Sequence, residues 1–190
     1  MKYIIEHLEP EMYEWCVIEY RHMSEIVGKD NLIFTNLKDV KGKEKLTFGK
    51  IEDERVENLK FDNICILDPN AEKALTSNDK FNYLIFGGIL GDHPPKERTK
   101  IELIDRFKKK GIKFETRNLG KEQMSTDTAL LVAKKITDGI KLSEIKFKDT
   151  IIIETGENEE VELPFRYVME NDKPVISKEL VEYLKREDVF

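Results

Sequence analysis

Short apolar runs follow one another along the first two thirds of the chain and predict strands. Two of them, ICIL and YLIF, are continuous rather than alternating, which is typical of strands covered on both faces of a parallel sheet. Each of these two runs ends in residues that favour turns. The five predicted strands are Lys2–Glu6, Leu32–Thr35, Ile64–Leu67, Tyr83–Phe86 and Ile112–Glu115.

Between these strands, apolar residues recur every three or four positions, which is the spacing of amphipathic helices. This spacing predicts helices over Glu11–Val27, Arg98–Lys110 and Ser125–Thr137, and Gly28 and Gly111 end the first two. The alternation of strands and helices predicts an α/β fold, with a parallel sheet flanked by helices.

The pattern changes after residue 149. Thr150–Glu154 and Val161–Val168 read as a β-hairpin around Gly156, and Ser177 is placed to cap a last helix that runs to Arg186. We therefore expect a main domain at 1–149 and a C-terminal hairpin and helix extension at 150–190. Within the main domain, residues 38–60 are polar and lack periodicity, so we expect a variable insertion there.

Composition narrows the class of protein. The 190 residues are 39% hydrophobic and 37% charged, which allows a core and excludes a membrane-spanning protein. Acidic residues interrupt the first fifteen positions, where a signal peptide would need an apolar stretch, so we expect a cytoplasmic protein. The net charge of -6 disfavours a broad phosphate-binding surface and favours basic partners.

Neither cysteines nor histidines suggest a metal site or a disulfide. Cys16 and Cys65 lie far apart and read as buried apolar residues. His7, His22 and His93 show no metal-binding spacing. We therefore expect no bound metal.

Three segments at predicted strand ends are candidates for a ligand site. Ligands of open α/β sheets bind beyond the carboxyl ends of the strands. Glycine allows the backbone to approach a ligand closely, and Gly87, Gly88 and Gly91 follow the fourth strand, although ordinary turn chemistry explains them equally well. The segments are Leu67–Leu75, Phe86–Pro95 and Arg117–Ala129.

Individual polar residues in these regions have two readings each. The helix that starts at Thr126 could bind an anion at its N-terminus, or Asp127 could simply favour the helix start. His93 precedes two prolines, and a structural hydrogen bond is favoured over a chemical role. Arg166 is expected to form an ion pair rather than bind an anion, and Trp15 is expected in the core, although it could stack on a substrate.

Glu19 is the strongest single candidate for chemistry. At about 100° per residue it falls within the apolar stripe of the first helix. A buried carboxylate is costly unless it is paired, so Glu19 is either part of a structural ion pair or a functional acid or base, and pairing has the higher prior.

Taken together, five motifs make the chain similar to a family of SPOUT-class methyltransferases. These are YIIEHLEPEMYEWCVIEY, ILDPNAEKAL, IFGGILGDHPPKERTK, RNLGKEQMSTDTA and ELPFRYV, in order along nearly the whole chain. Part of the family is described as RNA methyltransferases, and a eukaryotic branch as protein arginine methyltransferases that act on a ribosomal protein. The resemblance weakens over residues 38–60.

The resemblance implies S-adenosylmethionine (SAM) as the methyl donor, bound in a C-terminal trefoil knot. It places Asp92 and His93 near the methionine end of the donor. The residues that it places around the adenosyl group are Leu67, Gly87, Gly88, Ile89, Leu90, Gly91, Leu119, Gly120, Met124 and Thr126.

Three functions follow from this resemblance. An arginine acceptor needs a carboxylate pair, for which Glu19 and Asp92 are the candidates, and the acidic net charge favours a basic ribosomal or translation protein as substrate. RNA methylation by the same fold is the alternative, and a silent SAM-binding module is the third. The added C-terminal part could cover the surface through which such proteins dimerise, so we expect a monomer.

Overall fold

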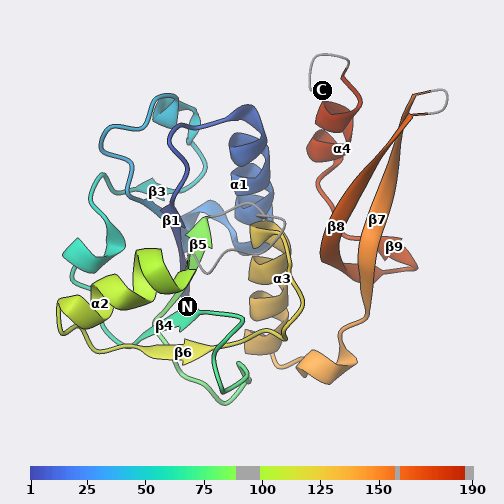
Figure 1. Ribbon diagram of the computed structural model, residues 1–190. Helices are drawn as coiled ribbons and strands as arrows, with labels where there is room; N and C mark the ends of the chain where they lie inside the picture. The colour runs from blue at the N-terminus through green and yellow to red at the C-terminus, as the bar shows by residue number, and fades with distance from the viewer. Residues whose placement is uncertain (89–98, 157–158, 187–190) are drawn as a thin grey trace.

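A six-stranded parallel sheet forms the centre of the protein in a computed structural model that describes residues 1–88, 99–156 and 159–186 (Figure 1). Its strand order is β3-β2-β1-β5-β4-β6, and every neighbouring pair is parallel. The predicted α/β class and parallel sheet are confirmed. The strands are β1 (Lys2–His7), β2 (Leu32–Thr35), β3 (Lys50–Ile51), β4 (Ile64–Leu67), β5 (Tyr83–Gly88) and β6 (Glu115–Arg117).

Alternate residues of the strands feed two separate apolar cores. Tyr3 and Ile5 of β1 belong to one core, whereas Ile4, between them, belongs to the other. Cys65 and Ile66 of β4 divide in the same way. Because both faces of the sheet are covered, both sets of side chains are apolar, which explains the continuous apolar runs in the sequence.

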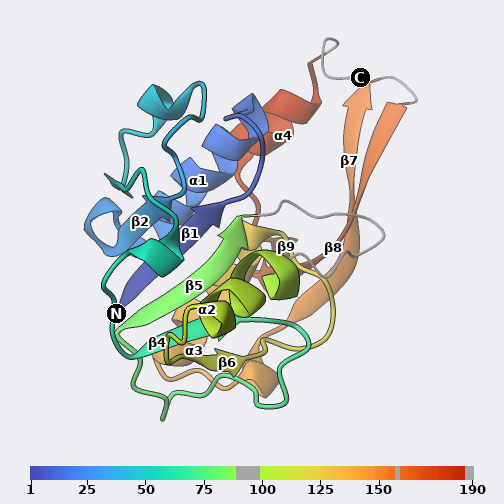
Figure 2. The same ribbon diagram turned by 60° about the vertical axis from the view of Figure 1, so that its left-hand side comes forward.

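Different helices cover the two faces (Figures 1 and 2). Helices α1 (Glu14–Val27) and α3 (Thr126–Thr137) pack on the core that contains Ile5. The other core is covered by the 3-10 turn η3 (Val56–Asn58), the π-helical turn η4 (Lys100–Ile104) and helix α2 (Asp105–Lys109). Three further 3-10 turns are η1 (Lys29–Asn31), η2 (Lys43–Lys45) and η5 (Leu142–Glu144).

The C-terminal part forms a small antiparallel sheet of its own. Strands β7 (Phe147–Gly156) and β8 (Glu159–Glu170) make the predicted hairpin, and β9 (Lys173–Pro174) pairs with β8. Ser177 caps α4 (Lys178–Leu184), as predicted, since its side chain accepts a hydrogen bond from the Leu180 N–H. Figure 1 shows this sheet and α4 on the α1 and α3 side of the molecule.

The last helix is tied to the main domain by two ion pairs. The guanidinium of Arg186 donates to both carboxylate oxygens of Glu14, at 2.6 and 2.9 Å. Arg21 pairs with Glu179 in the same region. Both pairs join α1 to α4 or to the residues just after it.

Three elements differ from the prediction. The fifth strand was placed at Ile112–Glu115, but β6 begins only at Glu115. The Ile112 N–H still bonds the Phe107 carbonyl, and Ile112 and Phe114 pack beneath α2, so their apolar character serves the core rather than the sheet. Residues 38–60 are not purely loop, because β3 lies within them, and β9 was not predicted. A two-residue strand carries no periodicity to detect.

Three further expectations concern the cysteines, the absence of a membrane span, and the knot with the domain boundary. Cys16 and Cys65 are buried, as predicted, and burial raises both thiol pKa values to about 12. No helix in the described part of the chain is long and apolar enough to span a membrane. The trefoil knot and the boundary between the two parts at residue 149 stay predictions.

Candidate active site

The parallel register gathers the carboxyl ends of the strands at one edge of the sheet. His7 of β1 lies opposite Gly88 of β5, and Leu67 of β4 lies opposite Arg117 of β6. The first turn of α3 lies at the same end of the molecule as the arrowhead of β5 (Figure 1). The segments after β4 and β6 and the start of α3 therefore come together at the edge where α/β sheets bind ligands.

Some of the residues expected around a donor molecule lie in the described part of the chain, and these residues are at or near this edge. Leu67 and Leu119 are buried, Met124 is half-buried against the same core, and Thr126 is buried in the first turn of α3. Gly87 lies near the end of β5 and is half-buried, and Gly88 is the last residue of that strand. Five expected residues lie outside the described ranges: Ile89, Leu90, Gly91, Asp92 and His93.

Gly120 has the backbone conformation that requires glycine. Its φ is 103°, and a Cβ placed there would meet no described atom within 4 Å. Its N–H donates to the side-chain oxygen of Asn118, at 3.1 Å. The backbone of the segment after β6 is thus held in a half-buried turn that leaves open space beside Gly120.

An ion pair with little exposure joins the last residue of β6 to the segment after β4. The guanidinium of Arg117 donates to Asp79 Oδ1 at 2.8 Å and lies over the ring of Phe81, 5.1 Å from its centroid. The Arg117 hydrogen bonds lower the pKa of the Asp79 carboxyl, although burial opposes this. These side-chain contacts therefore stabilise this edge of the sheet without a bound ligand.

The start of α3 is a buried polar network. Ser125 precedes the helix, but its side chain makes no capping bond to the backbone. Its hydroxyl donates to Asp127 Oδ1 at 2.6 Å, and the same oxygen accepts the Thr128 N–H at 2.7 Å. The interpretation that Asp127 simply favours the start of the helix is therefore incomplete, because its second carboxylate oxygen has another partner.

That partner is His22 of α1. Nδ1 of His22 lies 2.7 Å from Oδ2 of Asp127, and the two side chains are 12% and 2% exposed. Burial lowers the pKa of His22, but the hydrogen bond and the charge of Asp127 outweigh it, so the pKa is raised overall. The pair was not predicted, although His22 stands one helical turn beyond Glu19 on the same face of α1.

Glu19 is buried as predicted, at 7% exposure, but it forms no structural ion pair with any described residue. Its Oε2 is buried and accepts no hydrogen bond from the described part of the chain. Burial raises the pKa of Glu19 well above the usual range, and the negative charge of Asp127 raises it further. Among the described residues, the favoured structural ion pair of Glu19 is therefore not formed, and its carboxyl group is an unpaired one beside the His22–Asp127 pair.

Tyr167 of β8, in the C-terminal sheet, lies near Asp127 and Glu19. It is 2% exposed, and its pKa is raised by burial and by the charges of Asp127 and Glu19. Arg166, next to it, pairs with Asp149 at 2.6 Å, as expected for an ion pair rather than an anion site. Trp15 is only partly buried and stacks on Tyr13, with ring centroids 5.7 Å apart, so it is not a fully buried core residue.

A second buried carboxyl group lies on the opposite face of the sheet. Glu6 is fully buried at the end of β1, and its Oε2 accepts hydrogen bonds from Thr35 Oγ1 at 2.6 Å and Val56 N at 3.0 Å. Burial raises the pKa of Glu6 to about 7, although these bonds and the nearby Arg55 lower it. The sequence pattern did not single out this residue, because one acid in an apolar run is a weak signal.

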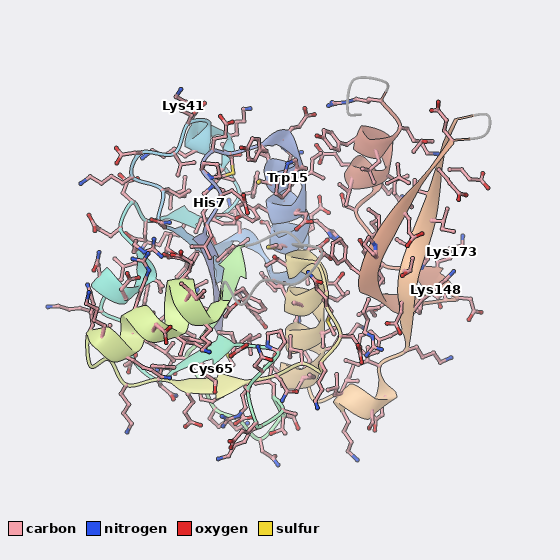
Figure 3. The ribbon with its side chains drawn as sticks, viewed as in Figure 1. His7, Trp15, Lys41, Cys65, Lys148 and Lys173 are labelled. Carbon is pink, nitrogen blue, oxygen red and sulfur yellow. The ribbon has the colours of Figure 1, made fainter. Side chains whose placement is uncertain are left out.

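The buried His7 lies at the end of β1 as well (Figure 3). Its Nδ1 is 2.9 Å from the hydroxyl of Tyr20, and burial lowers its pKa to about 4. The imidazole is therefore neutral, and it joins β1 to α1. We assign it a structural role.

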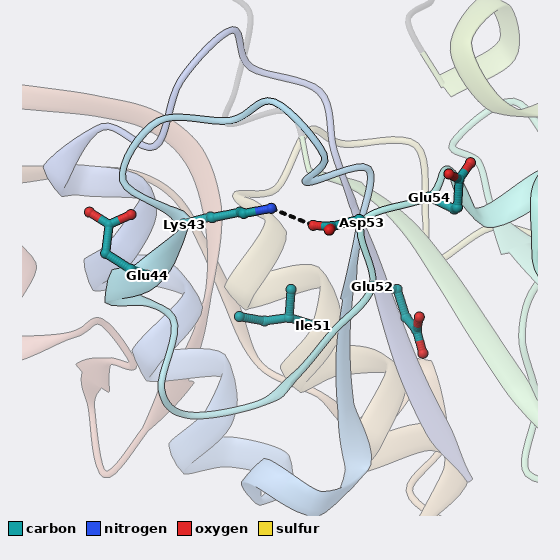
Figure 4. Close-up of a pocket in the computed structure, with 6 residues that line it drawn as sticks. All are labelled: Lys43, Glu44, Ile51, Glu52, Asp53 and Glu54. Atoms are coloured by element: carbon teal, nitrogen blue, oxygen red, sulfur yellow. Dashed lines mark hydrogen bonds and ion pairs between the residues drawn. The ribbon is translucent and has the colours of Figure 1, made fainter.

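A surface pocket is lined by side chains from residues 43–54 (Figure 4). Lys43 pairs with Asp53 across it, and Ile51 of β3 forms part of its wall. Three further acids complete the lining, Glu44, Glu52 and Glu54. The pocket lies at the β3 edge of the sheet, so it does not belong to the site at the start of α3.

Comparison with known proteins agrees with this arrangement. Protein arginine N-methyltransferase SFM1 of Saccharomyces cerevisiae is 39% identical over 207 residues, which covers 98% of this chain and 95% of SFM1. The crystal structure of yeast SFM1 complexed with SAM matches at a TM-score of 0.86 and 34% identity, covering 97% of this chain and 89% of that one.

A more distant structure shares the fold. A Trm10 protein of Thermococcus kodakaraensis matches at a TM-score of 0.60 and 19% identity, covering 76% of this chain and 96% of that one. At this identity the likeness concerns the fold alone. The family model described as protein arginine N-methyltransferase SFM1-like matches residues 2–189, and the chain therefore belongs to the SFM1-like family.

Proposed function

We propose that this chain is a SAM-dependent protein arginine N-methyltransferase. The observation that carries the proposal is the free, buried carboxyl group of Glu19 beside the Asp127–His22 pair, near the carboxyl edge of the sheet. A guanidinium group is the natural partner of a buried carboxylate that has none. Family membership and the SAM and SAH complexes of yeast SFM1 support the same activity.

The residues at the carboxyl edge fit a nucleoside-like donor. Leu67, Leu119 and Met124 offer apolar side chains for an adenine ring, and Gly120 leaves open space beside its backbone. In this proposal they hold the adenosyl group with Gly87, Gly88 and Thr126, and with Ile89, Leu90 and Gly91 of the following segment. A pocket of apolar walls with main-chain polar groups is typical of cofactor sites.

When bound, SAM supplies a sulfonium methyl group that ends on a guanidinium nitrogen, the electron pair of the broken C–S bond stays on sulfur, and one proton is released. Glu19 then has two tasks. Its carboxylate orients the guanidinium by charge-assisted hydrogen bonds, and one of its oxygens takes the released proton. Its high pKa suits the second task, because a carboxylate that binds a proton tightly is a better base.

Two further residues complete the proposed site. Asp92 is the second carboxylate that holds the guanidinium, and His93 lies near the methionine end of the donor. Both assignments rest on the family resemblance of the GGILGDHPP motif.

The acceptor in this proposal is an arginine of a basic ribosomal or translation protein in the cytoplasm. The chain carries 38 acids against 32 bases, and its net charge of -6 favours a basic partner over a polyanion. RNA methylation and a silent donor-binding module are the competing outcomes of the test below.

The test has two stages. Calorimetric titration with SAM and SAH should show saturable binding of both at one site. Incubation of the protein with methyl-labelled SAM and ribosome-containing extract should then place label on material that survives nuclease and is lost to protease, with methylarginine after hydrolysis. Label lost to nuclease would favour RNA, and donor binding without any label would favour the silent module.

A further inference from the structure

Asp127 is anchored on three sides within the first turn of α3. Oδ1 accepts hydrogen bonds from Ser125 Oγ and Thr128 N, and Oδ2 lies 2.7 Å from Nδ1 of His22. Only 2% of its side chain is exposed, so protein groups rather than water hold this carboxylate in place. It fixes both the position of the imidazole and the nitrogen through which the imidazole bonds.

His22 and Glu19 are three residues apart on α1, so their side chains share one helix face. Nε2 of His22 has no hydrogen-bond partner among the described residues, and Oε2 of Glu19 has none either. One face of α1 therefore carries two titratable side chains that both lie beside the bonded carboxylate of Asp127.

We propose that Asp127 and His22 form a positioning pair for Glu19, which receives the proton of Glu19 when a guanidinium group binds and returns it to solvent after the reaction. This inference rests on the proposed function and adds two residues to it. Neither residue needs to touch the substrate, because both act through Glu19.

The proton count of this cycle balances. At a pH above the pKa of His22 and below that of Glu19, the free protein holds a protonated Glu19 and a neutral His22, with Nδ1–H donated to Asp127. Binding of a guanidinium cation favours ionised Glu19, and its proton passes to Nε2 of His22, which becomes an imidazolium paired with Asp127. Methyl transfer releases one proton, which Glu19 takes. When the product leaves, the His22 proton goes to solvent, and the net result is one proton released per methyl group.

Among the residues that the structure describes, few other charges act on the pair from the elements around it. From α1, the exposed Glu25 raises the pKa of His22 less than Asp127 does. From β8, the hydroxyl of Tyr167 stays protonated, because burial and the charges of Asp127 and Glu19 raise its pKa. Asp127 is therefore the main determinant of the charge of His22, and Glu25→Gln is a matched control on the same helix.

The first test does not depend on methyl transfer. The probe is N-acetylarginine amide, added to the full-length protein at a pH above the pKa of His22. An NMR titration of the His22 ring nitrogens, assigned with His22→Gln, gives that pKa and follows the response of the ring. The ring should shift toward the imidazolium form in the wild type and in Glu25→Gln, but not in Glu19→Gln. A His22 ring that does not respond in the wild type, or that responds equally in Glu19→Gln, would overturn the proposal.

The second test is the pH profile of methyl transfer. His22 must be neutral to accept the proton, so activity should rise with pH through its pKa. Asp127→Asn lowers that pKa, so the acid limb should move to lower pH, and kcat should fall by about tenfold or more with the donor Kd unchanged. His22→Gln should lose the acid limb altogether. A purely structural role would lower stability and leave the acid limb of the remaining activity in place, which would also overturn the proposal.

The two proposals fail separately. If no acceptor is methylated while the His22 ring still responds to the arginine probe through Glu19, the positioning pair stands and the proposed function fails. If arginine is methylated and the acid limb of the pH profile is the same in Asp127→Asn and His22→Gln as in the wild type, the proposed function stands and the positioning pair is rejected.

Discussion

Oε1 of Glu6 lies 3.3 Å from Nε of Arg55, on the face of the sheet opposite α1 and α3. The same guanidinium nitrogen lies 3.2 Å from Glu57, whose carboxylate is also buried. Two buried carboxyl groups therefore share one arginine. Because Oε1 of Glu6 has no aligned hydrogen bond, the ionised form of Glu6 is poorly compensated.

Stability should therefore depend on the protonation of Glu6. Its pKa is raised from 4.5 to about 7 on folding, so the neutral form stabilises the fold below pH 4.5 and this contribution is lost as the pH rises through 7. Glu6→Gln stays neutral and should gain up to about 3 kcal/mol over the wild type between pH 5 and pH 8. Urea unfolding at both pH values measures this difference.

A control for this experiment is Glu54→Gln. Glu54 lies exposed on the same segment as Arg55. It should follow the wild type at both pH values. If the free energies of unfolding of Glu6→Gln and the wild type differ by the same amount at pH 5 and pH 8, the raised pKa of Glu6 is contradicted.

Glu19→Gln should separate chemistry from binding. The amide keeps the size of the side chain and the neutral state of the free site, so the free energy of unfolding at pH 7 should change by less than about 1 kcal/mol. Methyl transfer should fall by about a hundredfold or more, because the general base is lost. Donor affinity, measured by calorimetry, should stay within about twofold, and unchanged turnover would remove Glu19 from the site.

Gly120→Val should abolish donor binding if the segment after β6 holds the adenosyl group. A side chain at φ 103° is strained and would also fill the open space beside the backbone. Gly139 is the matched control, since its φ is 108°, it also has no described neighbour within 4 Å, and it lies beyond the opposite end of α3. Gly139→Val should lose similar stability and keep donor affinity, and equal affinities in the two variants would reject the pocket.

Arg117→Met should destabilise the fold through the segment after β4. The guanidinium is 11% exposed, pairs with the 13% exposed Asp79, and lies over Phe81. Its loss leaves the Asp79 carboxylate with little solvent and fewer donors, at a cost of about 2 kcal/mol. Chemical unfolding measures this cost. Glu115→Gln is the control, because Glu115 is 57% exposed and its pair with Arg117 should contribute under about 1 kcal/mol.

The sequence by itself determined the class of fold and the strands of the sheet centre. Runs such as Ile64–Leu67 are apolar at every position because each face of the parallel sheet packs against helices, and this cause leaves a direct trace in the sequence. The amphipathic period of α1 also placed Glu19 inside the buried stripe. Local periodicity suffices for such features because each depends on one element and one neighbour.

Only the tertiary structure decided which polar groups meet. The sequence favoured a structural ion pair for Glu19, but the pair is formed by His22 and Asp127, which are 105 residues apart. Glu19 has no partner beside it within the described ranges. The short strands β3 and β6 likewise form where partners offer hydrogen bonds, not where propensity is highest. Pairing of charges and of strand edges depends on distances between segments that are remote along the chain, and no local pattern encodes those distances.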